Sequence, residues 1–290
     1  MTADTIISVS TISDLRIAVE AWRGCGETIA LVPTMGGLHA GHLALVEAAR
    51  RLCRRTVVSI FVNPTQFGAG EDFESYPRDM ARDREMLANL GVDLIYAPSA
   101  AEMYPGGVAT EVRVSKLGEG LCAVQRPHHF PGVATVVAKL LGQCRPHVAL
   151  FGEKDYQQLL VIRRLARDLD LDVEIHGVPT VRESDGLAMS SRNAGLSANG
   201  RAVAGRLNHL LGDVARRIAA GDAVAEALAR GRDALIDLGF EAVDYLELRD
   251  AETLALLDEA TRPARLLAAV HIDGCRLIDN ITLVSGGDMY

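Results

Sequence analysis

The first 178 residues alternate between short apolar runs and longer stretches with helical periodicity. The apolar runs lie at 28–34, 55–62, 93–98, 147–151 and 173–178, and the helix-like stretches at 40–53, 78–90, 132–143 and 156–169. Apolar runs that end at Pro, Gly or Asn are typical of buried strands, and apolar residues three or four apart are typical of helices. The alternation predicts a Rossmann-like α/β domain, in which helices cover both faces of a doubly wound parallel sheet.

Beyond about residue 180 the pattern changes to helices followed by strands. Two Ala- and Leu-rich helical stretches, 198–220 and 222–238, precede strand-like runs at 242–248, 263–271 and 275–284. Helices followed by strands predict a separate, smaller α+β domain at the C-terminal end. We therefore expect two domains, residues 1–178 and residues 179–290.

The composition argues against several classes of partner. The chain has 30 basic and 38 acidic side chains, a net charge of −8, whereas nucleic-acid binders concentrate a basic excess. Five scattered cysteines without a Cys-x-x-Cys pair are typical of a reduced, cytoplasmic protein. No signal peptide is evident, and no apolar run approaches the roughly 20 residues of a membrane span. We expect a cytoplasmic protein with no nucleic-acid or membrane partner.

A histidine pair marks the junction between the first apolar run and the helix that follows it. The turn reads Pro-Thr-Met-Gly-Gly-Leu-His-Ala-Gly-His over residues 33–42. A helix start presents backbone N–H groups and the positive end of the helix dipole, and Gly41 lets a ligand approach the backbone closely. His39 and His42 can lie on one side of the first helical turn and donate to phosphoryl oxygens. The alternative is one solvated histidine and one packed against the sheet.

Two further polar clusters carry positive charge. In residues 151–158 (FGEKDYQQ), Lys154 offers a point charge to a polyphosphate, and Asp155 could cap a helix or hold a ribose or a metal. The alternative is a bland cap with a surface ion pair. Ser190, Ser191 and Arg192 form a compact set of donors for negative charge that develops on a phosphate. The alternative there is a polar loop without a ligand.

Uncharged polar residues follow the second apolar run. Asn63 and Gln66 could bind the hydroxyl groups or the carboxylate of a small substrate, or Asn63 could simply begin a turn. Ligands of open α/β sheets bind beyond the carboxyl ends of the strands, where these residues fall. The adjacent His128 and His129 suggest zinc, but no Cys or His stands at metal-ligand spacing, so we expect no metal site made by the protein.

The chain lacks the Gly-x-x-x-x-Gly-Lys-Ser/Thr, Gly-x-Ser-x-Gly and Gly-x-Gly-x-x-Gly motifs. Five of its blocks instead resemble the pantothenate synthetase (pantoate–β-alanine ligase) family. They are PTMGGLHAGH (33–42), SIFVNPTQFG (59–68), HFPGVATVVAKL (129–140), FGEKDYQQL (151–159) and GVPTVRESDGLAMSSRN (177–193). The first block looks like the His-x-Gly-His signature of the nucleotidylyltransferase superfamily. The stretch 189–192 resembles the Lys-Met-Ser-Lys-Ser-type loop of that superfamily.

The resemblance implies an AMP-forming ligase that works in two steps. The carboxylate of D-pantoate attacks the α-phosphorus of ATP, giving pantoyl adenylate and pyrophosphate. The amine of β-alanine then displaces AMP and forms pantothenate. ATP is thus a substrate, Mg²⁺ accompanies it, and the expected assembly is a homodimer formed through the first domain. The C-terminal domain would act as a lid that carries the Met-Ser-Ser-Arg loop.

The resemblance also assigns residues to the site. His42 is the matched catalytic residue, and His39, Lys154 and Arg192 complete the expected catalytic set. The residues expected to bind ATP are Met35, Gly36, Gly37, Leu38, His39, Ala40, Gly41, His42, Gly152, Glu153, Lys154, Asp155, Val181, Met189, Ser190, Ser191 and Arg192. Gln66 and Gln158 would hold pantoate, with Gln66 also beside β-alanine. Asn63 joins them as a substrate-binding candidate from its place after the strand.

Three positions depart from the family pattern. Cys122 stands where many members carry Glu, His128 replaces the Gly of a Pro-Gly-His-Phe turn, and Pro131 stands where a polar or basic residue is common. Other functions fit less well. A nucleotidylyltransferase for a phosphorylated substrate would need extra Arg or Lys contacts, and a tRNA synthetase would need an anticodon domain. A non-catalytic nucleotide sensor is disfavoured by the retained histidines, Lys154 and the Ser-Ser-Arg cluster.

Overall fold

Strand β2 (Ile29–Thr34) lies inside a six-stranded sheet in the computed structural model, which describes residues 6–68, 70–71, 73–260 and 263–283. The strand order is β1-β4-β3-β2-β5-β6, and all pairs are parallel. The other strands are β1 (Ile7–Val9), β3 (Arg55–Ile60), β4 (Leu94–Tyr96), β5 (Val148–Gly152) and β6 (Glu174–Val178). The predicted Rossmann-like parallel sheet is confirmed.

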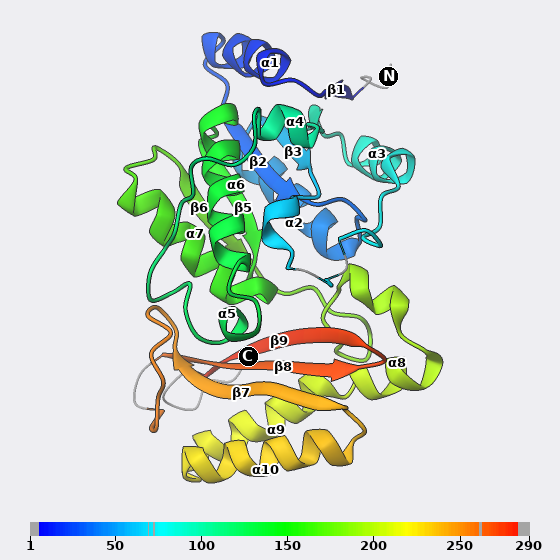
Figure 1. Ribbon diagram of the computed structural model, residues 1–290, viewed down its shortest axis with the longest axis vertical. Helices are drawn as coiled ribbons and strands as arrows, with labels where there is room; N and C mark the ends of the chain where they lie inside the picture. The colour runs from blue at the N-terminus through cyan, green and yellow to red at the C-terminus, as the bar shows by residue number, and fades with distance from the viewer. Residues whose placement is uncertain (1–5, 69, 72, 261–262, 284–290) are drawn as a thin grey trace. The chain divides into compact units, whose positions relative to one another are not determined.

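Helices follow the strands in sequence and cover both faces of the sheet (Figure 1). They are α1 (Ile12–Gly24), α2 (Ala40–Leu52), α3 (Met80–Asn89), α4 (Ala100–Met103), α5 (Cys122–Gln125), α6 (His129–Cys144) and α7 (Tyr156–Asp168), with 3-10 turns η1 (Pro64–Gln66) and η2 (Glu153–Asp155). Alternate β2 residues face different cores. Ile29 and Leu31 pack in the core that contains residues of α1, α6 and α7, whereas Ala30 and Val32 pack in the core formed with α2 and α3. Burial of both faces explains why the strands are continuous apolar runs.

The sequence pattern missed the N-terminal edge of this sheet. Strand β1 has only three residues, too few to show a periodicity, although Thr11 caps the following helix by accepting from the Asp14 backbone N–H. Helix α6 also begins three residues earlier than the predicted 132, because Pro131 lies in its first turn, where a missing N–H costs no helical hydrogen bond.

A second, antiparallel sheet has the order β7-β8-β9, and its strands are β7 (Ala242–Asp250), β8 (Ala264–Ile272) and β9 (Cys275–Leu283). Helices α9 (Leu207–Ala219) and α10 (Val224–Asp237) pack on one of its faces around a separate core (Figure 1). This part is the predicted α+β arrangement, and residue 284 of the last predicted strand lies outside the described residues.

The long helix predicted over 198–220 is wrong in one respect, because the chain breaks into α8 (Ala198–Ala204) and α9. The break falls at Gly205, where a Cβ would lie 2.2 Å from Asp185 Oδ2. The close approach of a carboxylate from a distant loop therefore requires glycine at this point, and glycine weakens helix continuity.

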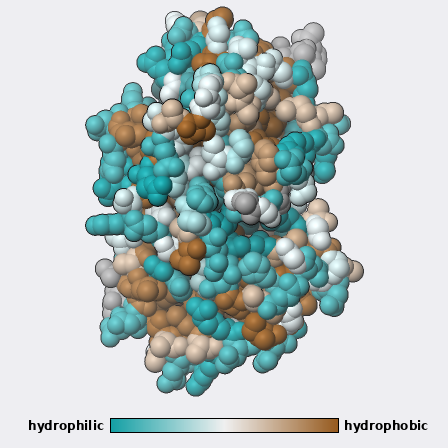
Figure 2. Space-filling model, in the orientation of Figure 1, coloured by the Kyte–Doolittle hydropathy of each residue, from teal (hydrophilic) through white to brown (hydrophobic). Residues whose placement is uncertain are grey.

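The chain forms two compact units. The first contains the described residues up to Glu153 together with Gln157–Pro179, and the second contains Lys154–Tyr156 together with the described residues from Thr180 onward. Within the described part of the chain, no helix combines the length and apolar character needed to cross a membrane. Figure 2 shows a mainly hydrophilic face with scattered hydrophobic groups.

Candidate active site

The first unit gathers its polar clusters at the carboxyl ends of three neighbouring strands. Strand β2 leads into the turn before α2, β3 leads into η1, and β5 leads into η2. The chain passes from β2 to β3 on one side, and β5 pairs with β2 on the other side, so the strand order reverses at β2. A crevice at such a switch point is the usual ligand site of open α/β sheets.

The turn that follows β2 is shaped by a buried carboxylate. Gly36 and Gly37 have φ values of 85° and 62°, a region that favours glycine. The backbone N–H groups of Gly37 and Leu38 donate to Oδ2 and Oδ1 of Asp83, at 2.9 Å each. Asp83 lies on α3 and is 2% exposed. These two N–H groups are therefore occupied within the protein. Sequence reasoning missed Asp83 because it is one of several charges on a surface-like helix.

His39 and His42 cap the first turn of α2. His39 Nδ1 accepts from the Gly41 N–H at 3.1 Å, and His42 Nδ1 accepts from the His39 N–H at 3.4 Å. The two ring centroids are 4.1 Å apart. A neutral imidazole that accepts at Nδ1 carries its proton on Nε2. The local fold thus makes both histidines Nε2–H donors, which suits phosphoryl oxygens.

Both ends of the Gln66 side-chain amide have hydrogen-bond partners. Its Nε2 donates to the sulfur of Met35 at 3.1 Å, so the structure brings the turn after β2 next to η1. Its Oε1 accepts from Asn63 Nδ2 at 3.2 Å. Asn63 is 1% exposed and also contacts the Gly132 carbonyl and the Tyr104 hydroxyl. The Asn63 amide is therefore committed to the protein interior and orients Gln66.

The backbone carbonyl of Gln66 is held from the following helices. Arg126 Nη2 donates to it at 3.3 Å, and His129 Nδ1 lies 3.2 Å from it. Arg126 also forms an ion pair with Glu71. Burial alone would raise the pKa of Glu71, but the hydrogen bond and charge of Arg126 hold that pKa below its usual range. His129 thus contacts the turn that carries Gln66.

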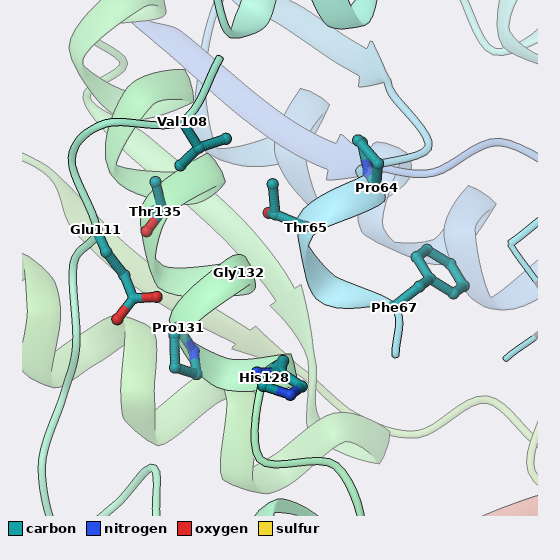
Figure 3. Close-up of a pocket in the computed structure, with 9 residues that line it drawn as sticks. All are labelled: Pro64, Thr65, Phe67, Val108, Glu111, His128, Pro131, Gly132 and Thr135. Atoms are coloured by element: carbon teal, nitrogen blue, oxygen red, sulfur yellow. The ribbon is translucent and has the colours of Figure 1, made fainter. Parts of the chain in front are cut away.

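His128 and Pro131, two of the positions where the sequence analysis expected a departure from the family pattern, line a cavity of about 200 Å³ (Figure 3). Its walls are Pro64, Thr65, Phe67, Val108, Glu111, His128, Pro131, Gly132 and Thr135. A Cβ on Gly132 would lie 2.5 Å from the Thr65 carbonyl oxygen, so glycine is needed where α6 meets η1. His128 and Pro131 thus lie in a cavity wall next to the turn that carries Gln66.

Gln157, which the sequence reasoning passed over in favour of Gln158, anchors the loop before α5. Its Nε2 donates to the Leu117 carbonyl at 3.0 Å, and its Oε1 accepts from the Cys122 N–H at 3.2 Å. Gln157 is buried, whereas Gln158 is partly exposed on the next position of α7. Gln158 is thus the more accessible of the two amides.

Gly152 and Glu153 belong to the first unit, whereas Lys154, Asp155 and the predicted residues from Val181 onward belong to the second. A short antiparallel turn brings Val181 and Met189 together, since the Met189 N–H donates to the Val181 carbonyl at 2.9 Å. Ser190 then caps the 3-10 turn η3 (Ser191–Gly195) by accepting from the Arg192 N–H at 3.3 Å. The loop that carries the two hydroxyl groups and the guanidinium is therefore ordered locally.

Arg201 on α8 holds the segment that precedes this loop. Its guanidinium donates to Glu183 at 2.6 Å and to Asp185 at 2.5 and 3.1 Å. The hydrogen bond from Arg201 lowers the pKa of Asp185. The same pair of carboxylates raises the pKa of Arg201.

We expect Asp83→Asn to weaken ATP binding by about tenfold or more. An amide can accept only one of the two N–H groups and presents its own N–H to the other, and hydrogen bonds to a charged group are each worth about 1.5–3 kcal/mol. Asp93→Asn is the matched control, because Asp93 accepts from the Thr56 N–H and from Arg55 elsewhere in the first unit. ATP affinity can be measured by titration calorimetry. An equal loss of affinity in both variants would contradict the view that Asp83 shapes the turn for ATP.

Arg201→Met should lower the free energy of unfolding at pH 7 by about 1 kcal/mol or less, since the pair is partly solvent-screened. The folded pKa of Asp185 lies below its unfolded value of about 3.9, so its contribution is present above that pH and is lost as the pH falls through the folded pKa. Urea unfolding should show the difference between variant and wild type shrink below about pH 4. Arg216→Met, at an exposed pair on α9, is the control. A difference independent of pH would refute the role of Asp185.

Comparison with known proteins gives one consistent result. The family model for pantoate-beta-alanine ligase matches residues 7–282. The pantothenate synthetases of Sphingopyxis alaskensis and Paramagnetospirillum magneticum are each 55% identical to this chain over 273 residues, covering 94% of it and 98% and 96% of their own lengths.

Solved structures agree. A pantothenate synthetase from Thermus thermophilus has a TM-score of 0.91 and 49% identity, covering 96% of this chain and 100% of its own. A pantoate-beta-alanine ligase from Francisella tularensis, complexed with beta-gamma ATP and beta-alanine, has a TM-score of 0.82 and 31% identity, over 95% of this chain and 97% of its own. With its histidine turn at the switch point of the parallel sheet, the chain belongs to the pantoate–β-alanine ligase family.

Proposed function

We propose that this chain condenses D-pantoate with β-alanine at the expense of ATP, and that pantoyl adenylate is the intermediate. The observation that carries the proposal is the pair of imidazole rings at the start of α2, each of which accepts a backbone N–H at Nδ1. Membership of the ligase family supports the choice of substrates.

In the first step, a carboxylate oxygen of pantoate forms a bond to the α-phosphorus while the bond to pyrophosphate breaks. Negative charge concentrates on the phosphoryl oxygens, and fixed donors stabilise it more in the transition state than in the ground state. We assign His42 and His39 to this task, with Lys154 and Arg192 as the two cations. Since Asp83 already occupies the Gly37 and Leu38 N–H groups, the imidazoles are the main donors of this turn.

We assign the nucleotide contacts to the turn after β2 and to the two loops that carry positive charge. The proposed ATP-binding residues are Met35, Gly36, Gly37, Leu38, His39, Ala40, Gly41, His42, Gly152, Glu153, Lys154, Asp155, Val181, Met189, Ser190, Ser191 and Arg192. The positive φ of Gly36 and Gly37 removes side chains from one stretch of this turn, which lets a ligand lie close to the backbone.

Gln66 and Gln158 are the proposed contacts of pantoate, and Gln66 would also lie beside β-alanine. A thioether is a weak hydrogen-bond acceptor, so a substrate oxygen would replace Met35 as the partner of Gln66 with a gain in bond strength. Asn63 is reassigned in this proposal from substrate contact to positioning residue, because its amide is committed to Gln66, Gly132 and Tyr104. In the second step the neutral amine attacks the activated carbonyl and AMP leaves, which requires mainly positioning.

Three further properties complete the proposal. Mg²⁺ would enter the site together with ATP. Among the described residues, no group of three or more His, Cys, Asp or Glu side chains could hold a metal ion. Mg²⁺ that is bound through phosphate groups and water does not require such a group. We also propose a homodimer formed through the first domain and a cytoplasmic location, for which the family resemblance and five scattered cysteines without a Cys-x-x-Cys pair are the support. Residues 1–178 and 179–290 are retained as the proposed domains.

The proposal is tested by pyrophosphate release. With ATP and D-pantoate alone we expect about one pyrophosphate per site, because the adenylate stays bound. Adding β-alanine should convert this burst into steady turnover with equal amounts of AMP and amide. Pyrophosphate formed without pantoate would contradict the ligase assignment and favour a different nucleotidylyl transfer.

His42→Ala should slow adenylation by about 100- to 1,000-fold, the usual effect of removing one preorganised donor from a charged transition state. His176→Ala is the control, because His176 lies on the outer strand β6 with its side chain 39% exposed. Single-turnover measurement of pantoyl adenylate distinguishes the two variants. An unimpaired His42→Ala enzyme with native stability would remove His42 from the mechanism.

A further inference from the structure

Lys154 lies two residues after β5, a strand of the first unit, yet it groups with the second unit. Glu153 and Gln157 belong to the first unit, whereas Lys154–Tyr156 belong to the second. The last two residues between β5 and α7 and the first residue of α7 thus group with the second unit.

Strand β9 supplies the direct contact. Asn280, which is 3% exposed, donates from Nδ2 to the Lys154 carbonyl at 3.0 Å. Arg265 on β8 donates to Asn280 Oδ1 at 2.9 Å, which orients the amide. The Arg265 guanidinium also lies 4.1 Å from the centroid of the Tyr156 ring, and the Tyr156 hydroxyl donates to the Ala251 carbonyl at 2.7 Å. The backbone around Lys154 is therefore held at two points, the Lys154 carbonyl and the side chain of Tyr156.

The residue before Asn280 holds the second cationic loop. Asp279 is buried and accepts two hydrogen bonds from Arg182, at 2.7 and 2.9 Å. The Asn280 carbonyl accepts from Arg182 at 3.3 Å as well. Arg182 follows Val181, which is bonded to Met189 at the start of the Met-Ser-Ser-Arg loop. Two consecutive side chains of one strand thus hold both loops.

We infer that Asn280 is a positioning residue for adenylation, which acts by holding Lys154 on the same strand that holds the Met189–Arg192 loop. This inference rests on the proposed role of Lys154 in the reaction. The spacing between the two cationic loops is then set by a buried β-strand instead of by flexible chain. Such preorganisation matters because donors that need not rearrange stabilise the transition state most.

The chemistry of the amide explains why asparagine occupies this position. The Lys154 carbonyl requires a donor and Arg265 requires an acceptor, and an amide supplies both from one side chain. A carboxylate at this position would accept from Arg265, but its oxygen would repel the Lys154 carbonyl oxygen. A purely structural asparagine would affect the folding of the second unit without a specific link to Lys154.

A double-mutant cycle tests the link. In the presence of Lys154, Asn280→Ala should slow single-turnover adenylation by about tenfold, with the KM for pantoate within about twofold of wild type. In a Lys154→Ala background, the same substitution should change the rate by less than about twofold. The reason is that substitutions of two residues that act as one unit do not have additive effects. Thr282→Ala, at an exposed position of β9, is the control and should change neither rate.

Equal effects of Asn280→Ala in both backgrounds, or no rate effect of Lys154→Ala itself, would overturn the inference. If Asn280→Ala does not fold, as judged by circular dichroism and urea unfolding, Tyr156→Phe removes only the hydroxyl bond to Ala251. It should slow adenylation about threefold, again only when Lys154 is present. Wild-type enzyme that releases no pyrophosphate with ATP and pantoate would refute the proposed function itself, which separates that failure from failure of the cycle.

Discussion

The reversal of strand order at β2 is the constraint on which the first unit depends. Because all six strands are parallel, their carboxyl ends meet at one edge, and chain connections leave β2 and β5 in different directions. The turn before α2, η1 and the end of β5 therefore collect at one edge of the sheet, although they are separated in sequence by roughly 30 and 90 residues. The contact between Gln66 and Met35 is a direct product of this arrangement.

Much of the polar chemistry near this edge serves the protein itself. Asp83 shapes the glycine turn, Asn63 orients Gln66, and Gln157 holds the loop before α5. Each is buried, and each would be costly to leave without partners in a low-dielectric interior. The side chains proposed to contact a substrate thus rest on a layer of amides and carboxylates that fixes their orientation. His39 and His42 extend this principle, since backbone donors select the tautomer of each ring.

The second unit holds its cationic loops in a different way. Its contacts run from β9 to Lys154 and to Arg182, and from α8 to the carboxylates of the 182–193 loop. Arg182 and Arg201 are used as structural clamps, whereas Lys154 and Arg192 are the two cations proposed to bind a polyphosphate. A planar guanidinium suits the clamps because it binds a carboxylate through two parallel hydrogen bonds.

The sequence by itself determined the parallel sheet, the α+β character of the C-terminal part and the histidine turn. These features are local: burial on both faces produces continuous apolar runs, and a helix start with Gly and His is recognisable within ten residues. The same reasoning missed β1, which is too short for a periodicity, and the break at Gly205, which depends on Asp185. Only the tertiary structure decided that Asp83 holds the turn, that Asn63 is a support and that Lys154 packs with β9. The contacts that decide these points join residues 45 to 126 positions apart, and no pattern within a segment encodes which distant side chain the folded chain brings to it.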